Sequence, residues 1–460
     1  MARGKKKETL TPEERLQAAL VPESEQPYKV PENWCWTALK HISSHISDGS
    51  HNPPKDSGKG IPLLSATNIR DHLIDIDSAV RWITEDQWTI ENQRTKIETN
   101  DVLLTIVASI GRTAVVKNEQ FALQRSVAVI KPKINSEFLS YYFESPYIQQ
   151  FMLDNAKGTA QKGFYLNSLV ELFCCVPPLA EQQRIVDRIE SLFAKLDEAK
   201  QNVQDALDSF ETRKAAILHK AFTGELTAQW RKEHDVGMES WEEKTINDIG
   251  DVKGGKRIPK GMELTYENTG HPYLKAGNLK QGTVIASGMM YVTDEILECI
   301  KNYTVSAGDV YITNVGACIG DCGIIPPEYD GANLTENAVK ITNLKCNNKW
   351  LSYYLSGSSV QQNIKSMIAS ATLGKLSIAN IKKIELNIPT SLDEQIEIVC
   401  ILDNLFAKEQ QAKDAAEGVL EQIDLIKKAI LARAFRGELG TNDPSEESAQ
   451  ELIKNFIFKM

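Results

Sequence analysis

The feature that most constrains this chain is an internal repeat. The stretch from Glu181 to Leu226 aligns without a gap to the stretch from Glu394 to Leu439, at a constant offset of 213 positions. About twenty of the 46 aligned positions are identical, including Leu-Phe-Ala-Lys at 192–195 and again at 405–408. Gapless agreement over this length indicates duplication of one structural unit, so we expect two copies of one plan.

The segments between the repeats also correspond, although more loosely. Leu-Ser-Tyr-Tyr at 139–142 recurs at 351–354, and Gln-Gln at 149–150 recurs at 361–362. The shared positions are mostly apolar residues or glycine, whereas the residues expected in loops differ. This division predicts one fold that carries two different specificities.

Within each repeat the apolar residues recur in steps of four and three. That period is typical of a left-handed coiled coil and spans about 33 residues, or about 50 Å of helix. The simplest partner for each helix is the other copy, so we predict an antiparallel pair that acts as a ruler; two separately buried core helices are the alternative. Gly224 and Gly437 are expected to provide left-handed C-terminal caps. The predicted seam comprises Ile185, Ile189, Leu192, Leu196, Val203, Phe210 and Ile217 in the first repeat and Ile398, Leu402, Leu405, Val419, Ile423, Ile426 and Ile430 in the second.

Residues 31–175 and 236–388 are expected to be mixed α/β. Runs rich in β-branched residues at 101–107 and 309–313 predict strands. Each region also holds basic, glycine-rich loops at equivalent places. Glycine lets a backbone approach a phosphate, lysine neutralises it, and arginine, asparagine or glutamine can bind base edges in two-point contacts.

These loops predict a DNA-binding face in each copy, although for any single residue an ordinary solvated loop is the alternative. In the first copy the candidates are Ser50, His51, Lys55, Lys59, Asn68, Arg70, Arg112, Gln124, Arg125, Lys157, Thr159, Gln161 and Lys162. In the second copy they are Lys253, Lys256, Arg257, Lys260, Asn278, Lys280, Asn314, Asn333, Thr335, Thr372 and Lys375.

The composition limits the classes of protein only weakly. The net charge of −10 neither supports nor excludes DNA, because the two larger segments are nearly neutral and can still present a basic face. Eight cysteines and seven histidines show no disulfide framework or metal-ligand spacing, which predicts reduced thiols and no metal site, with zinc binding by cysteines as the alternative. No apolar run approaches the roughly 20 residues of a membrane span, so we expect a cytoplasmic protein.

Three short patterns resemble catalytic motifs, but each lacks a residue, a spacing or a structural setting that the motif requires. Asn-Pro-Pro-Lys at 52–55 has lysine where adenine methyltransferases place an aromatic residue against the flipped base. Ser-Gly-Lys-Gly at 57–60 has the wrong spacing for a phosphate-binding loop. Glu-Ala-Lys at 198–200 lies on the predicted heptad helix, without the strand and the aspartate of a nuclease. A binding protein without catalytic residues is therefore predicted.

Longer motifs mark the two helical repeats. Pro-Pro-Leu-Ala-Glu-Gln-Gln-Arg-Ile-Val at 177–186 opens the first helix, and Ala-Phe-Thr-Gly-Glu-Leu at 221–226 closes it. Ala-Phe-Arg-Gly-Glu-Leu at 434–439 closes the second. With these motifs and the alternating order of its segments, the chain resembles the specificity (S) subunits of Type I restriction–modification systems over about residues 12–440. The junction at 389–395 departs from the Pro-Pro-Leu-Ala form.

The resemblance implies an α+β protein with a pseudo-twofold repeat, in which two target recognition domains are separated by an antiparallel coiled coil. Each domain would read one half of a split, asymmetric DNA site through the major groove, and the helices would set the gap. The expected parts are an N-terminal extension (1–30), recognition domain 1 (31–178), helical repeat 1 (179–235), recognition domain 2 (236–390), helical repeat 2 (391–440) and a tail (441–460).

The resemblance also implies partners. Two modification subunits would bring adenine methylation that depends on S-adenosylmethionine, and two restriction subunits would add translocation and cleavage that use ATP and Mg. This chain itself would bind no cofactor and no membrane. Residues 11–22 and 441–460 would pack near each other or on a modification subunit. The alternatives are a related phage-exclusion methylation system, a free-standing DNA-modifying enzyme and a coiled-coil scaffold.

Overall fold

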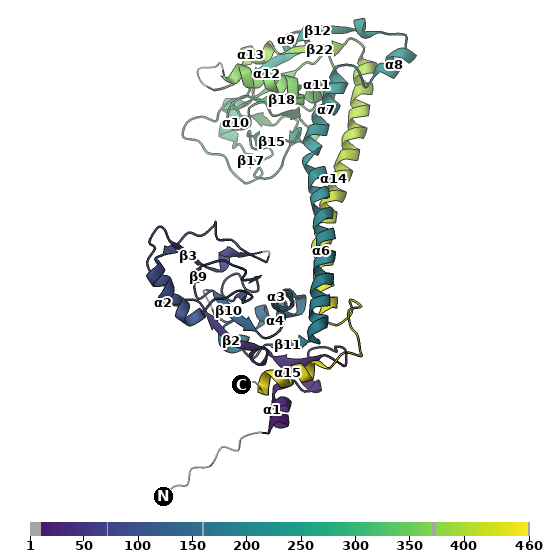
Figure 1. Ribbon diagram of the computed structural model, residues 1–460. Helices are drawn as coiled ribbons and strands as arrows, with labels where there is room; N and C mark the ends of the chain where they lie inside the picture. The colour runs from purple at the N-terminus through teal and green to yellow at the C-terminus, as the bar shows by residue number, and fades with distance from the viewer. Residues whose placement is uncertain (1–10, 71, 159–160, 370–373, 459–460) are drawn as a thin grey trace. The chain divides into compact units, whose positions relative to one another are not determined.

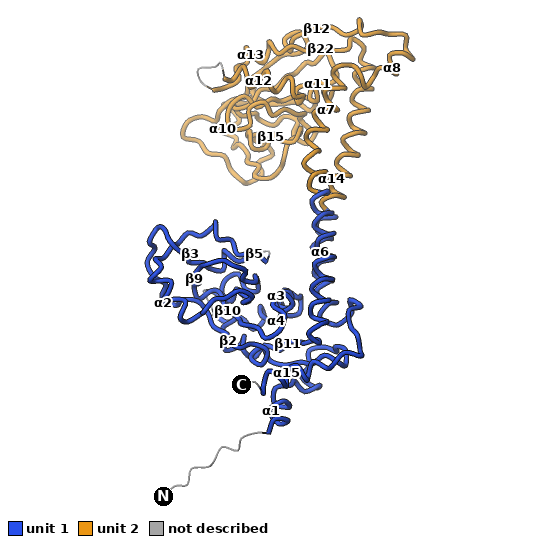
Figure 2. The backbone as a smooth tube through the Cα atoms, in the orientation of Figure 1, with its two compact units in different colours: residues 1–203, 418–460 blue, residues 204–417 orange. Residues whose placement is uncertain are grey.

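The computed structural model describes residues 11–70, 72–158, 161–369 and 374–458. The chain forms two compact units, which Figure 2 colours separately. Unit 1 comprises residues up to 203 together with 418–460, and unit 2 comprises residues 204–417. The six predicted parts of the sequence therefore group into two bodies, each with one recognition domain and a portion of both helical repeats.

The recognition domain of unit 1 is built on a four-stranded antiparallel sheet in the order β2-β10-β7-β8. The inner strands β7 and β10 are almost entirely buried because both of their faces are covered, and helix α3 packs against β7 and β8 (Figure 1). The strands are β1 Cys35–Ala38, β2 Ser43–Asp48, β3 Ile61–Leu64, β4 Ile69–Arg70, β5 Leu73–Ile74, β6 Trp82–Ile83, β7 Val102–Thr105, β8 Thr113–Val115, β9 Ala122–Leu123, β10 Val127–Pro132 and β11 Phe173–Val176. The helices outside the long pair are α1 Pro12–Ala19, α2 Glu85–Thr95, α3 Ser136–Glu144, α4 Pro146–Asp154, α5 Leu166–Leu169 and α15 Ala449–Phe458.

The recognition domain of unit 2 repeats this plan element by element, with the sheet order β13-β21-β18-β19. The strands are β12 Trp241–Thr245, β13 Asp251–Gly254, β14 Pro272–Leu274, β15 Leu279–Lys280, β16 Thr283–Val284, β17 Met290–Tyr291, β18 Val310–Thr313, β19 Cys322–Ile324, β20 Asn333–Leu334, β21 Ala338–Thr342 and β22 Glu385–Pro389. Its helices are α9 Ile246–Ile249, α10 Asp294–Ile300, α11 Asn348–Ser356, α12 Ser358–Ala369 and α13 Ile378–Lys382. The matching sheet orders confirm the predicted duplication of the recognition domains.

The long helices are α6 Leu179–Asp208, α7 Phe210–Phe222 and α14 Leu392–Ala434, followed in the first repeat by α8 Ala228–Glu233. In unit 1, Asp197 pairs with Lys427 at 2.5 Å and Lys200 pairs with Asp424 at 3.7 Å. In unit 2, Arg213 pairs with Glu409 at 2.9 Å, and Lys214 Nζ lies 5.9 Å from the Phe406 ring centroid. Partner numbers fall as residue numbers rise, so the predicted antiparallel pairing is confirmed within each unit.

The predicted seam is correct for the first helix and needs a correction in the second. Ile185, Ile189, Ile398, Leu402 and Ile423 are buried. The half-buried positions are Leu192, Leu196, Val203, Phe210, Ile217, Leu405 and Ile430.

Val419 and Ile426, by contrast, are 39% and 45% exposed, so their assignment to the seam is wrong. The seam passes one position further along, through Leu420 and Lys427. Lys427 fits there because its aliphatic stem lies in the seam while its ammonium group pairs with Asp197 and lies 4.9 Å from the Phe193 ring centroid.

Gly224 and Gly437 cap the two helical repeats as predicted, with φ of +79° and +74°. A side chain at Gly437 would also overlap Pro31, and one at Gly224 would overlap Met238. Gly437 therefore requires glycine for both backbone conformation and close packing, whereas at Gly224 the flexible Met238 side chain can move and the backbone conformation is the main requirement.

The described parts of the two terminal segments pack together in unit 1. Helix α1 contacts helix α15, and the Val21 amide donates to the Trp36 carbonyl at 2.9 Å. Lys133 lies 5.6 Å from the Phe456 ring centroid, so the tail also contacts the recognition domain. The predicted proximity of residues 11–22 to the tail is confirmed for its described part, residues 441–458. Within the described ranges, no helix combines the length and the apolar character needed to cross a membrane.

Candidate nucleic-acid interface

In unit 1, backbone hydrogen bonds draw several loops to one edge of the recognition domain. The Ser50 amide donates to the Leu123 carbonyl at 2.7 Å, which joins the end of β2 to the loop before β10. The Phe164 amide donates to the Ile106 carbonyl at 2.7 Å, and the Ala108 amide donates to the Lys162 carbonyl at 3.1 Å. The Ile106 amide also donates to the Ser126 carbonyl at 2.9 Å, so loops 48–51, 106–112 and 124–126 and residues 157–158 and 161–163 are neighbours.

Unit 2 has the same backbone frame. The Lys256 amide donates to the Leu334 carbonyl at 2.8 Å, as Ser50 does to Leu123. The Leu376 amide donates to the Asn314 carbonyl at 3.0 Å, as Phe164 does to Ile106. We call each of these loop edges a recognition edge: residues 48–51, 106–112, 124–126, 157–158 and 161–163 in unit 1, and residues 254–257, 313–320, 335–337 and 374–377 in unit 2.

A glycine makes the first crossing of each recognition edge possible. A side chain at Gly49 would overlap the Leu123 carbonyl, and one at Gly255 would overlap the Thr335 carbonyl. The sequence analysis gave loop glycines the role of approaching phosphates. At these two positions the close neighbour is instead the backbone of the same domain.

The first loop of unit 1 carries a charged cluster around Asp48. This carboxylate is buried and accepts from Arg94, which lies on helix α2, and from His51 at 2.8 Å. The Arg94 guanidinium and the His51 ring lie 3.4 Å apart, and both are about half exposed. A buried anion thus holds two nitrogen-rich side chains at the surface of the recognition edge.

The recognition edge of unit 2 carries a charged cluster around Glu336, which lies in the loop before β21. Arg257 Nε donates to Glu336 Oε1 at 2.5 Å, and Tyr273 Oη lies 3.4 Å from Oε2. Partial burial alone would raise the pKa of Glu336, but hydrogen bonds from Arg257 and Thr335 outweigh it and hold that pKa below its usual value. The same pair raises the pKa of Arg257.

Several predicted DNA contacts prove to be structural. Asn68 accepts from the Ser65 amide and donates to the Asp75 carbonyl. In unit 2, Asn278 likewise accepts from the Lys275 amide and donates to the Ile285 carbonyl. Asn333 donates to the Ile300 carbonyl from a fully buried position. Because these side chains bind backbone groups inside the domain, we assign them to the scaffold. Residues Ser50 and Thr335 are also buried, although they lie on the recognition edges.

Most other candidates have exposed side chains, and their contact with DNA stays a prediction. The exposed set is His51, Lys55, Lys59, Arg70, Arg112, Arg125, Lys157, Gln161, Lys162, Lys253, Lys256, Arg257, Lys260, Lys280 and Lys375, with Gln124 and Asn314 half-buried. Arg70 pairs with Asp75 beside the β4–β5 hairpin. Thr159 and Thr372 lie outside the described residues.

The sequence analysis missed Arg94, Glu336 and Tyr273. Arg94 lies 43 residues after His51 on a helix with no unusual pattern, and only the fold brings it to Asp48. Glu336 was not among the predicted contacts, because its role as an anchor for Arg257 depends on tertiary contact. A signal did exist for Glu336, since Arg125 occupies the equivalent position in the first copy.

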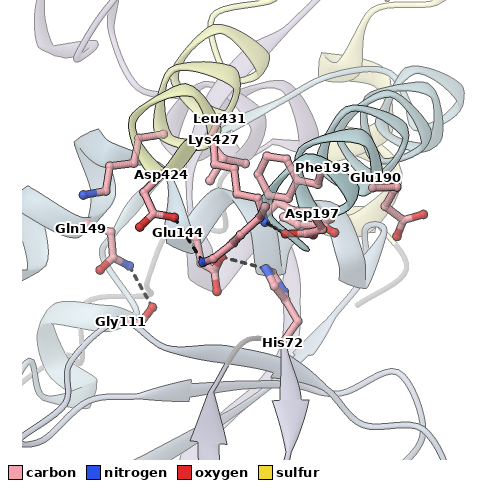
Figure 3. Close-up of a pocket in the computed structure, with 14 residues that line it drawn as sticks. His72, Gly111, Glu144, Gln149, Glu190, Phe193, Asp197, Asp424, Lys427 and Leu431 are labelled. Atoms are coloured by element: carbon pink, nitrogen blue, oxygen red, sulfur yellow. Dashed lines mark hydrogen bonds and ion pairs between the residues drawn. The ribbon is translucent and has the colours of Figure 1, made fainter. Parts of the chain in front are cut away.

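Unit 1 also has a pocket of about 920 Å³ between α3 and the long helices. Figure 3 shows His72 and Glu144 pointing toward each other, with Nε2 of His72 2.8 Å from Oε2 of Glu144. Gln149 donates to the Gly111 carbonyl at 2.8 Å, and Lys427 faces Asp197. Acidic and basic groups are mixed on its walls, so it lacks the positive field that a DNA backbone needs.

Comparison with known proteins decides the family. The family model described as the Type I restriction modification DNA specificity domain matches twice, over residues 54–207 and 238–417. The chain belongs to the Type I restriction–modification DNA specificity family. The two matched segments fall on the two recognition domains and the helices that follow them, so the specificity domain occurs once in each copy.

Individual relatives and solved structures agree with this family. The EcoBI specificity subunit of Escherichia coli is 35% identical over 212 residues, which is 45% of this chain and 44% of that one. The EcoKI specificity subunit of Escherichia coli strain K12 is 22% identical over 448 residues, covering 89% of this chain and 90% of that one.

Two solved structures share the fold. The HsdS subunit from Thermoanaerobacter tengcongensis has a TM-score of 0.57 at 19% identity, and it covers 90% of this chain and 100% of its own. A chain from a study of complex assembly and conformational transition in the type I R-M system has a TM-score of 0.65 at 18% identity, with the same coverage. At these identities the specificity-subunit fold alone is supported.

Proposed function

We propose that this specificity-family chain recognises a bipartite, asymmetric DNA site, with one half read by each recognition domain. The observation that carries the proposal is the pair of recognition edges, which share a backbone frame and differ in side chains. Ser50 is replaced by Lys256, and Arg125 by Glu336, at equivalent points of that frame. Different donors and acceptors on one scaffold select different bases, so the two half-sites need not be related by symmetry.

The long helices are proposed to set the gap between the half-sites. Helix α14 runs through 43 residues, or about 65 Å at 1.5 Å per residue. Half-sites read from one face of DNA lie about 34 Å apart, one helical turn. Helices of this length can span that separation. Inserting one heptad into both repeats at matched positions should lengthen the gap in the recognised site, whereas an unchanged gap would contradict the ruler.

Two modification subunits are proposed to dock on the helices, and two restriction subunits to join through them. Exposed apolar side chains at the start of the helices support docking, because isolated helices in water rarely present such residues on several turns. Leu179 and Leu392 occupy equivalent positions and are each about half exposed, as is Ile396. S-adenosylmethionine, ATP and Mg would then bind to the partners, which carry out methylation and cleavage.

Genome-wide mapping of methylated adenine tests the central proposal. The host strain and a strain lacking this gene should differ by one bipartite motif. Replacing residues 31–175 with those of a relative should alter one half of that motif and leave the other half and the gap unchanged. Loss of no motif, or a change in both halves, would contradict the proposal.

A second experiment addresses catalysis. The purified chain incubated with S-adenosylmethionine and host DNA should transfer no methyl groups, and addition of the modification subunit should restore transfer. Methylation by the chain alone would favour a free-standing enzyme.

A further inference from the structure

The two recognition edges share one arrangement that their sequences do not share. In unit 1 the Arg94 side chain is 49% exposed and pairs with Asp48, whose side chain is 9% exposed. In unit 2 the Arg257 side chain is 77% exposed and pairs with Glu336, which is 29% exposed. Each edge therefore presents one exposed arginine that is held from behind by a more buried carboxylate.

The two pairs are built from non-equivalent positions. The hydrogen bonds of Ser50 and Lys256 align the two frames, and in that alignment Asp48 corresponds to Gly254 and Glu336 corresponds to Arg125. The carboxylate has moved from the first loop to the loop before β21. The arginine has moved from helix α2 into the first loop, one residue after Lys256.

This relocation argues against a purely structural ion pair. A bridge needed to hold the shared frame would stand at the same positions in both copies, because the frame itself is the same. What the copies retain is an exposed, oriented guanidinium beside the first loop. Neighbouring groups stiffen each carboxylate further: His51 binds the second oxygen of Asp48, and Tyr273 lies against Glu336.

A guanidinium held in this way suits the reading of a base edge. Arginine has five N–H donors in a planar fork, and a carboxylate that occupies one side leaves the others directed outward. Guanine offers two acceptors, O6 and N7, in the major groove, and a two-point contact with arginine distinguishes it from the other bases. Fixing the fork before binding makes this discrimination sharper than a mobile lysine allows.

We propose that Arg94 and Arg257 each read one guanine, in the half-sites bound by unit 1 and unit 2 respectively, and that Asp48 and Glu336 are their positioning residues. The proposal rests on the proposed function of the recognition edges. It adds the base-reading residue of each edge and the base class that it selects.

The test uses the full chain in complex with its modification subunit. The wild-type motif is first mapped in the host, and each base pair of both halves is then varied in a panel of synthetic duplexes. Competition binding at two salt concentrations compares wild type with Arg94→Ala, Arg94→Lys, Arg257→Ala and Arg257→Lys. Each arginine's variants serve as the matched control for the other half-site.

We expect Arg94→Ala to reduce discrimination at one G·C pair of one half by about 10- to 100-fold, with the other half unchanged. Arg257→Ala should do the same in the opposite half. Arg94→Lys and Arg257→Lys should behave like their alanine counterparts, since lysine keeps the charge and loses the fork. Asp48→Asn should weaken discrimination at the Arg94 position by a smaller factor.

Two results would overturn the inference. Uniform weakening on all duplexes, with the salt dependence reduced by about one ion and with lysine restoring binding, would assign the arginines to phosphates. Unchanged binding with reduced thermal stability would make the pairs structural. A wild-type complex without any bipartite motif would instead overturn the proposed function, so the two failures are distinguishable.

Discussion

Glu181 and Glu394 begin the two long helical repeats at equivalent positions, and both are completely buried, yet their partners differ. Glu394 accepts from Arg231 at 2.7 Å and from Thr227 at 2.9 Å, both in the segment after α7. Among the described residues, no cation is hydrogen-bonded to Glu181; this carboxylate accepts from Asn442 at 2.9 Å and Thr441 at 3.2 Å, which belong to the tail. A tryptophan donates to each carboxylate, at 2.8 Å in unit 1 and 3.1 Å in unit 2.

This difference shows which parts of a duplicated fold can change. The tryptophan–glutamate contact and the apolar packing around it are kept in both copies. The remaining donors come from whichever segment follows the opposite helix, and the position equivalent to Arg231 in the tail is Pro444. Arg184 instead binds Glu446 through two hydrogen bonds, which fastens the tail to the start of α6.

The largest effect is expected from removing Arg231, the cation that pairs with the buried Glu394. Arg231→Ala should lower the local stability of unit 2 by about 3–5 kcal/mol, because it leaves Glu394 buried without a counter-ion. Hydrogen exchange of peptides from 225–245 and 392–402 measures this loss, with peptides from unit 1 as the internal reference. The matched control, Arg231→Met with Glu394→Met, should restore most of the loss. An equal loss of protection in both units would contradict the claim that Arg231 stabilises unit 2 specifically.

Truncation of equivalent apolar residues should destabilise the two copies equally. Ile185 and Ile398 are equivalent and both are completely buried. Ile185→Ala and Ile398→Ala should each cost about 2–5 kcal/mol, with similar values, because the neighbours around them are of the same kind. The same exchange experiment compares them. Costs that differ by several kcal/mol would show that the copies differ in packing as well as in polar contacts.

Replacement of the two tryptophans by phenylalanine should cost unequal amounts of stability. Trp34→Phe removes a donor from Glu181, whose hydrogen-bond partners within the described residues are all neutral, and we expect a loss of about 1–3 kcal/mol. Trp241→Phe should cost less, because Arg231 and Thr227 remain on the same oxygen of Glu394. Thermal unfolding, read together with exchange in each unit, ranks the two variants. The reverse ranking would contradict the role given to Arg231.

The smallest effect is expected from the Arg257–Glu336 pair of unit 2. Glu336 occupies the position that Arg125 occupies in unit 1. The folded-state pKa of Glu336 lies below its unfolded value, so the folded state binds fewer protons. The stability from this pair is therefore present above the unfolded pKa of about 4.5 and is lost as pH falls through the folded pKa. Since Arg257 is largely exposed, the difference between wild type and Glu336→Gln should stay below about 1 kcal/mol.

Chemical denaturation at pH 7 and at pH 3.5 measures that difference. It should be smaller at the lower pH, because below about 4.5 protonation of Glu336 in the unfolded state begins to offset the contribution of the pair. A difference that grows on acidification would mean that the pair opposes folding.

Much of the fold could be predicted because duplication and periodicity are local properties of the chain. The strands over 102–105 and 310–313 and the capping glycines follow directly from residue type and spacing. The line of the α14 seam could not be predicted reliably. Val419 and Ile426 fit the heptad pattern as well as Leu420 does, and lysine at 427 looks unfit for a seam until its partner Asp197 is known.

The candidate site was less predictable because an exposed polar residue and a buried one look the same in sequence. Asn68 and Asn278 were chosen for their side chains, yet they close loops inside each domain. Arg94 was overlooked because nothing near it in the sequence marks its neighbour.

The sequence by itself determined that the protein contains an internal duplication with two long heptad helices. A constant offset between repeats and a 3.5-residue period can both be recognised without knowledge of the tertiary structure. Only the tertiary structure decided which charges meet: Asp48 with Arg94, Glu336 with Arg257, and Glu394 with Arg231. The physical reason is that apolar patterning specifies how elements are built, whereas a buried carboxylate is defined by partners that lie tens to hundreds of residues away.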